Sequence, residues 1–137
     1  MKKSSVAPDD AVQVRVRYPE VDRMGVAHHT NHFVWFEVGR TELMRRRGLP
    51  YARMEEDGFL LPVIEASCSY RAPARYDDLL LVRTEIGRLS PVRFTFSYRI
   101  EREVDGVLLA TGSTTHAVIG PGGRPRRLPA AILGILG

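Results

Sequence analysis

Between Asp22 and His32 the sequence gathers one aspartate and three histidines, His28, His29 and His32, directly before a strongly apolar segment. Carboxylate and imidazole groups this close in sequence suit proton transfer or nucleophilic attack, and histidines also bind metals. A polar loop before a buried helix is the structural alternative, because aspartate is common in turns. Catalytic site, metal site and plain loop are therefore the interpretations to weigh.

The histidine spacing argues against a metal site. His28 and His32 are four residues apart, but the predicted helix starts between them, so their rings need not share a face. The chain also lacks an H-E-x-x-H motif, which would place two histidines on one helical face. We expect no metal and no cofactor.

The elements on either side of the loop follow from hydrophobic periodicity. Residues 12–18, "VQVRVRY", alternate apolar and polar side chains and predict a half-buried strand that Pro19 ends. A long helix is predicted over about residues 31–47, with Thr30 or Asn31 as its capping residue. Its first half is apolar on nearly every side, which predicts burial all round.

Glu37 lies in the most apolar part of this predicted helix. A buried carboxylate needs a partner, and Arg40 is within reach one turn later. A structural ion pair between Glu37 and Arg40 is the first interpretation, and Glu37 as a catalytic base is the second.

After Gly58 the pattern changes to period two and predicts four consecutive antiparallel strands. The Asp-Gly pair at 105–106 marks a hairpin between the last two. A turn or short second helix precedes them, over residues 49–58. The predicted strands cover residues 59–72, 77–89, 92–103 and 107–120. One buried helix followed by one long meander favours an α+β fold in which the sheet curls around the helix.

The totals favour one soluble domain. The chain has 137 residues, of which 44% are hydrophobic and 26% charged. We expect a single domain over residues 1–137, with a disordered lead-in over about 1–10 and a tail over about 121–137. No apolar run is long enough to span a bilayer, and no secretory signal is recognisable at the N-terminus. With Cys68 as the lone cysteine, the cytoplasm is the expected compartment.

The net charge of +4 is carried mainly by arginines that are spread along the chain. The run Arg45 to Arg47 falls in the last turn of the predicted helix, where cations complement the helix dipole. No basic stripe with interleaved aromatic residues occurs, so nucleic acid is not an expected partner.

A spaced motif runs through the loop and the predicted helix: Tyr18, Asp22, Gly25, Val26, His29, Asn31, Trp35, Phe36, Glu37, Arg40, Thr41 and Glu42. In these residues the chain resembles the hotdog-fold acyl-CoA thioesterases, in their 4-hydroxybenzoyl-CoA thioesterase-like and YbgC-like branch. The segment "LPVIEASCSYRAPARYDD" is also similar to the second strand and following turn of that family, and the resemblance covers about residues 12–125. His32 departs from the family pattern, which has tyrosine there, and this departure bears on the substrate.

The resemblance implies a curved antiparallel sheet wrapped around a central helix, and a dimer or tetramer with active sites at the dimer interface. It implies that Asp22 is the catalytic carboxylate, as general base or nucleophile, assisted by His29 and Tyr18. Gly25 and Val26 are the expected backbone donors for the oxyanion. The expected pocket residues are His32, Phe33 and Phe36, and the candidates for binding coenzyme A are Arg71, Arg75, Arg88 and Arg93.

The expected activity is hydrolysis of an acyl-CoA, with acyl carrier protein as the other possible carrier of the acyl group. A hotdog dehydratase or hydratase is the enzymatic alternative, although the H-F-P-G type of motif is absent. A non-catalytic acyl-binding module is the remaining alternative, and the intact Asp22 and His29 argue against it.

Overall fold

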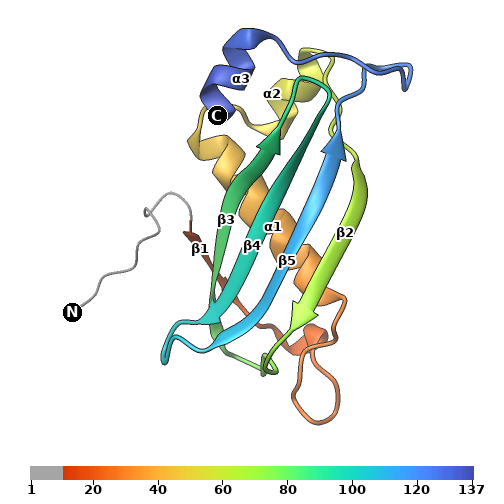
Figure 1. Cartoon of the computed structure of the whole chain (residues 1–137). Helices are drawn as coiled ribbons and strands as arrows, with labels where there is room; N and C mark the ends of the chain where they lie inside the picture. Colours follow the sequence, from red (N-terminus) through yellow and green to blue (C-terminus); the bar gives the residue numbers. More distant parts are fainter. Residues whose placement is uncertain (1–10) are drawn as a thin grey trace, which may run out of the picture.

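The structure is a computed structural model that describes residues 11–137, so the lead-in expected over residues 1–10 lies outside it. One antiparallel sheet has the strand order β1-β3-β4-β5-β2. Helix α1 (Asn31–Arg46) lies across one face of this sheet (Figure 1). The strands are β1 (Ala11–Arg15), β2 (Val63–Tyr70), β3 (Leu79–Leu89), β4 (Arg93–Arg102) and β5 (Leu108–Ala117).

Three shorter helices complete the described chain. A 3-10 turn, η2 (Tyr18–Glu20), follows β1, and α2 (Tyr51–Glu56) forms where a turn or short helix was expected. The apolar end of the tail forms α3 (Ala130–Leu136). None of the helices within residues 11–137 is both long and apolar enough to cross a membrane.

The period-two pattern of β4 places one face of the strand in the core. Phe94, Phe96, Tyr98 and Ile100 are buried on the face that α1 covers. The Phe36 ring of α1 stacks on the Tyr98 ring at 4.2 Å between centroids. Aromatic rings bury large apolar areas, so this helix-to-sheet contact contributes strongly to stability.

Glycines let α1 approach the sheet closely. A Cβ atom at Gly112 of β5 would lie 2.5 Å from the Phe36 ring and 2.5 Å from the Ser67 carbonyl oxygen. A Cβ atom at Gly39 of α1 would lie 2.5 Å from the Thr84 hydroxyl. The absence of these side chains therefore sets the spacing between the helix and the strands beneath it.

The predicted meander is wrong in one connection. β2 does not pair with β3, which follows it in sequence, but with β5 at the far side of the sheet. The neighbour of β3 on its other side is β1. Alternating apolar residues identify a strand but do not identify its partner, so the crossover could not be read from periodicity.

The prediction that α1 is buried all round is also wrong. Val34 and Val38 are 48% and 39% exposed, and Glu37 between them is exposed as well. Beside this helix face, β2 exposes Val63 and Ile64 at the edge of the sheet. The apolar residues that suggested complete burial thus form an uncovered surface of the isolated chain.

The capping prediction fails in its detail. Thr30 is the residue before the first turn of α1, but its side chain makes no capping hydrogen bond. The Asn31 side chain instead donates to the Glu20 carbonyl oxygen at 2.9 Å. This bond ties the start of α1 to the 3-10 turn after β1, and so holds the ends of the intervening loop together.

Candidate active site

The loop between η2 and α1 is a tight turn built around Asp22. The Asp22 N–H donates to the Val26 carbonyl at 2.9 Å, and the Gly25 N–H donates to the Asp22 carbonyl at 2.9 Å. Gly25 has a φ of 77°, a conformation that glycine adopts without strain. The Asp22 carboxylate oxygen Oδ1 accepts the N–H groups of Met24 and Val26 at 2.8 and 3.1 Å. One carboxylate oxygen is therefore fixed in place, while the side chain as a whole remains exposed.

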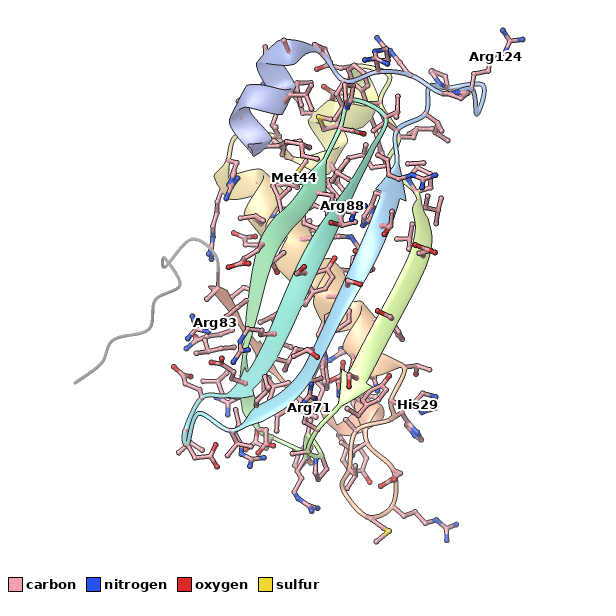
Figure 2. All side chains as sticks on the ribbon, viewed as in Figure 1. His29, Met44, Arg71, Arg83, Arg88 and Arg124 are labelled. Carbon is pink, nitrogen blue, oxygen red and sulfur yellow. The ribbon has the colours of Figure 1, made fainter. Side chains whose placement is uncertain are left out.

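His29 lies on the same loop, close to the end of β2. Its carbonyl oxygen accepts the Tyr70 hydroxyl at 2.8 Å and lies 3.0 Å from His32 Nδ1. Because a carbonyl only accepts, His32 Nδ1 carries the proton of this bond. His29 itself is exposed, and Figure 2 shows it at the end of the sheet where the loop projects.

A cavity of about 360 Å³ opens between this loop, the start of α1 and the segment after β2. His32 is 3% exposed and forms part of its wall, with its ring 4.7 Å from the Tyr70 ring. Burial lowers the pKa of His32, so its imidazole is neutral at pH 7. The lining residues are Val26, Ala27, His29, His32, Tyr70, Arg71, Ala72, Pro73 and Ala74.

Two of the proposed catalytic residues do not line this cavity. Asp22 belongs to the same loop as His29 but is not part of the cavity wall. Tyr18 is 75% exposed on η2, where its ring packs edge-on against Tyr76 at 5.8 Å. Tyr18 therefore does not belong to the core of this chain.

The expected oxyanion donors are already engaged. The Gly25 and Val26 N–H groups both donate to Asp22, so they are not free for a substrate oxygen in this conformation. Three and four residues after Val26 the backbone offers free donors. Within the described part of the chain, the N–H groups of His29 and Thr30 have no acceptor.

The expected pocket residues separate in space. His32 lines the cavity beside His29, whereas Phe33 lines a second cavity of about 290 Å³ between α1 and β2. Phe36 is fully buried against Tyr98 and the strand beneath it. The residues of the second cavity are Phe33, Val34, Glu37, Arg40, Val63, Ala66 and Thr114.

The four candidate arginines also fall into separate places. Arg71 lies at the loop end of the sheet beside His29, and Arg88 lies toward the opposite end (Figure 2). Arg88 and Arg93 share a groove of about 430 Å³ whose lining includes Ser90, Thr95 and Thr115. Arg75 follows the cavity segment, and its N–H donates to Asp78 Oδ2 at 2.9 Å. Arg88 and Arg93 alone converge on one groove.

The predicted ion pair between Glu37 and Arg40 is absent. Glu37 is exposed, and within residues 11–137 no carboxylate forms an ion pair with Arg40. The Nε atom of Arg40 is buried without a hydrogen-bond partner, and so is the Tyr51 hydroxyl. Burial raises the pKa of Tyr51 to about 12, an effect that the nearby positive charge of Arg40 partly opposes.

Arg40 starts a buried chain of hydrogen bonds. Its Nη1 lies 3.5 Å from the Tyr98 hydroxyl, which lies 2.6 Å from Thr114 Oγ1. Thr114 Oγ1 lies 2.9 Å from His116 Nε2, and His116 Nδ1 lies 2.9 Å from the Leu61 carbonyl oxygen. An arginine only donates and a carbonyl only accepts, so every bond runs in one direction when His116 is neutral.

Sequence reasoning did not single out Tyr70 or this buried chain. Tyr70 meets the loop only because β2 ends beside it, and no sequence spacing links the two.

The histidines do not form a metal site in the structure. Within residues 11–137 no group of three His, Cys, Asp or Glu side chains is arranged to hold a metal ion.

Comparison with known proteins identifies relatives across most of the chain. The model of the thioesterase superfamily matches residues 24–109. The acyl-CoA thioester hydrolase YbgC of Escherichia coli is 30% identical over 88% of this chain and 90% of its own. The 1,4-dihydroxy-2-naphthoyl-CoA hydrolase of a Synechococcus species is 30% identical over 81% of this chain and 77% of its own.

Solved structures agree with the sequence relatives. The TT1821 protein of Thermus thermophilus superimposes with a TM-score of 0.87 at 42% identity, over 93% of this chain and 96% of its own. A DHNA-CoA thioesterase of Staphylococcus aureus superimposes with a TM-score of 0.82 at 34% identity, over 86% of this chain and 79% of its own. These likenesses confirm the predicted hotdog fold.

Proposed function

The chain belongs to the thioesterase superfamily, and on that premise we propose that it hydrolyses acyl-CoA thioesters to the free acid and CoA. The observation that carries the proposal is the loop at the start of α1. It holds an exposed carboxylate, Asp22, in a tight turn, and Val26, which donates to this carboxylate, lines a cavity together with His29 and His32. Its relatives include hydrolases named for acyl-CoA substrates.

Asp22 is the proposed reacting group. As general base it takes a proton from water while the water oxygen attacks the thioester carbonyl carbon. As nucleophile its own oxygen attacks, and water then hydrolyses the resulting anhydride. Either way the C–S bond breaks, the thiolate of CoA leaves, and a proton returns to it. The backbone donors to Oδ1 leave the other carboxylate oxygen, Oδ2, available for this chemistry.

The oxyanion requires donors near the carbonyl oxygen. The free N–H groups of His29 and Thr30 support a site at the entrance to α1, where the helix dipole also favours negative charge. Gly25 and Val26 can contribute only if the substrate displaces their bonds to Asp22. In this proposal His29 orients the carbonyl or the water, and the exposed Tyr18 hydroxyl reaches the substrate from η2.

A second copy of the chain is the proposed partner. The edge strand β2 leaves its outer backbone groups unpaired and exposes Val63 and Ile64, while the adjacent face of α1 exposes Val34 and Val38. Pairing two β2 edges would satisfy the backbone and cover both apolar surfaces at once. This surface supports a dimer.

The groove with Arg88 and Arg93 is the proposed site for the coenzyme phosphates, because two guanidinium groups and several hydroxyls converge there. Arg88, which lines this groove, lies toward the end of the sheet opposite His29 (Figure 2). Antiparallel pairing of two β2 edges brings opposite ends of the two copies together. The arginines of one copy would therefore serve the Asp22 loop of the other.

The deciding experiment is thiol release from a panel of short, long and aromatic acyl-CoAs, with acyl carrier protein thioesters included. We expect turnover by the unchanged protein and a loss of about 100-fold or more in Asp22→Asn. The asparagine oxygen can still accept the Met24 and Val26 N–H groups, so the loop should persist. Asp57→Asn is the matched control, since Asp57 is an exposed aspartate at the end of α2. Equal turnover in Asp22→Asn would refute the proposed mechanism.

Mixing two inactive variants tests the proposed sharing of the site. Asp22→Asn chains keep the arginines, and Arg88→Ala/Arg93→Ala chains keep the carboxylate. If the site is shared, a mixed dimer contains one site with both features, and activity returns on mixing. If each chain builds its own site, no mixed dimer has an intact one and activity stays low.

A further inference from the structure

Arg40 and Glu37 lie on the uncovered face of α1, and neither forms an ion pair within residues 11–137. Both line the cavity of about 290 Å³ between α1 and β2, together with the exposed apolar residues Val34 and Val63. A partly buried guanidinium without a counter-ion is costly, because burial removes water without replacing its interactions. Some carboxylate should therefore approach Arg40 in the functional protein.

On its side toward the core, the Arg40 guanidinium contacts only neutral groups of the described chain. Its Nη1 contacts the Tyr98 hydroxyl at the start of the buried chain that ends at the Leu61 carbonyl. The chain supplies hydroxyl and imidazole groups but no negative charge. The missing counter-ion must therefore come from the cavity side, where Glu37 is the lining carboxylate.

Glu37 does not fill this role within its own chain. It is exposed on α1, and no ion pair joins it to Arg40. We propose that Glu37 and Arg40 pair between two copies of this chain, each Glu37 carboxylate closing on Arg40 of the partner subunit across the uncovered face of α1. The surface is thereby self-complementary in charge, as well as apolar at Val34 and Val38.

The geometry of a twofold axis allows both pairs to form together. If the axis crosses α1 beside Glu37 and Val38, the two helices run antiparallel. Measured along the helix direction, Arg40 of the partner subunit then lies about 3 Å from Glu37, because each helical residue rises about 1.5 Å. A long arginine side chain spans that offset, so one symmetric contact makes two equivalent ion pairs.

The inference rests on the second copy invoked in the proposed function, but its test does not use hydrolysis. Glu37→Arg and Arg40→Glu would each place like charges together, and we expect each to weaken self-association by about tenfold or more. Sedimentation measures the dissociation constant, with circular dichroism as the check on folding. Arg53→Glu and Glu56→Arg are matched controls, because these two exposed residues have the same spacing on α2.

Mixing distinguishes a pair between chains from a pair within one. Glu37→Arg chains and Arg40→Glu chains should form a heterodimer, since both contacts across the axis then join opposite charges. Association of the double variant Glu37→Arg/Arg40→Glu without association of the mixture would assign the pair to a single chain and overturn the proposal. Undiminished self-association of both single variants would overturn it as well.

Neutral substitutions cover the case in which Arg40→Glu fails to fold. Glu37→Gln and Arg40→Gln should each weaken the dimer, and the double variant should be no weaker than the more affected single variant. If the losses of association free energy in the two single variants added up in the double variant, the proposed pairing would be contradicted. Thiol release by Asp22→Asn reports on the active site alone, so failure of the ion pair and failure of the proposed activity remain distinguishable.

Discussion

The Tyr70 hydroxyl at the end of β2 lies 2.8 Å from the carbonyl oxygen of His29. Its ring also packs edge-on against His32 at 4.7 Å. One residue of the edge strand therefore holds the loop that carries the proposed chemistry and forms a wall of the adjacent cavity. The edge strand β2 and the candidate site are therefore directly connected through Tyr70.

Tyr70→Phe tests this connection. The ring contact with His32 is kept while the bond to the His29 carbonyl is lost, and we expect about 1 kcal/mol less stability. A less ordered loop should lower kcat several-fold more than it raises KM. Tyr76→Phe is the matched control, because Tyr76 is 52% exposed and its ring contacts Tyr18. Equal kcat and KM in the two variants would show that the hydrogen bond from Tyr70 to the His29 carbonyl does not affect turnover.

Much of the fold could be predicted because its signals are local. The alternation in β4, the Asp-Gly turn before β5 and the apolar run of α1 each act within a few residues. The pairing of β2 with β5 could not be predicted, since alternation is the same whatever strand lies alongside. The exposure of Val34 and Val38 could not be predicted either, because periodicity identifies apolar residues but not what covers each of them.

The candidate site was predictable in part for a similar reason. The turn at Asp22 and Gly25 is short-range, and the resemblance supplied its proposed role. Tyr70 and the chain from Arg40 to His116 join residues far apart in sequence, so only the folded chain reveals them. The Glu37 and Arg40 prediction failed because helical spacing allows a pair without enforcing one.

Gly112→Ala tests the close packing of α1 on the sheet. The added methyl group would lie 2.5 Å from the Phe36 ring and 2.5 Å from the Ser67 carbonyl oxygen. Relieving the second contact would require the backbone of β2 to move. We expect a loss of about 1–3 kcal/mol, measured by denaturant unfolding. Gly122→Ala is the control, since nothing lies within 4 Å of its added Cβ. Similar stability of both variants would contradict the packing argument.

His116 should make stability depend on pH in mildly acidic solution. It is fully buried, and burial lowers its pKa from 6.5 to about 4. The unfolded chain therefore binds a proton at a higher pH than the folded one. The stability from this group is complete above about pH 6.5 and is lost as the pH falls toward 4, by about 3 kcal/mol in total.

Protonation also conflicts with the buried chain of hydrogen bonds. His116 Nε2 would become a donor toward Thr114 Oγ1, so the Thr114 hydroxyl proton would lose the acceptor that neutral His116 provides. Unfolding free energies measured from pH 4 to 8 for the unchanged protein and His116→Gln check the prediction. The variant should be less stable at pH 7 and should lack the His116 part of the pH slope. Parallel curves for the two proteins would refute it.

His32→Ala should widen the acyl preference. His32 is nearly fully buried, lines the cavity beside His29 and has a neutral imidazole at pH 7 because burial lowers its pKa. Removing the ring enlarges the cavity next to the proposed oxyanion donors, so bulky acyl groups should gain in kcat/KM relative to short ones. The cost is lost packing against Trp35 and Tyr70, expected at about 2–3 kcal/mol of unfolding free energy.

Phe33→Ala is the matched comparison for the acyl preference of His32→Ala. Phe33 lies next to His32 in sequence but lines the cavity between α1 and β2 instead. If the acyl group occupies the cavity beside His29, only His32→Ala should change the ratio of kcat/KM between aromatic and short acyl-CoAs. A change confined to Phe33→Ala would assign the acyl group to the cavity that Glu37 and Arg40 share. The ratio therefore identifies which cavity receives the acyl chain, independently of any change in overall rate.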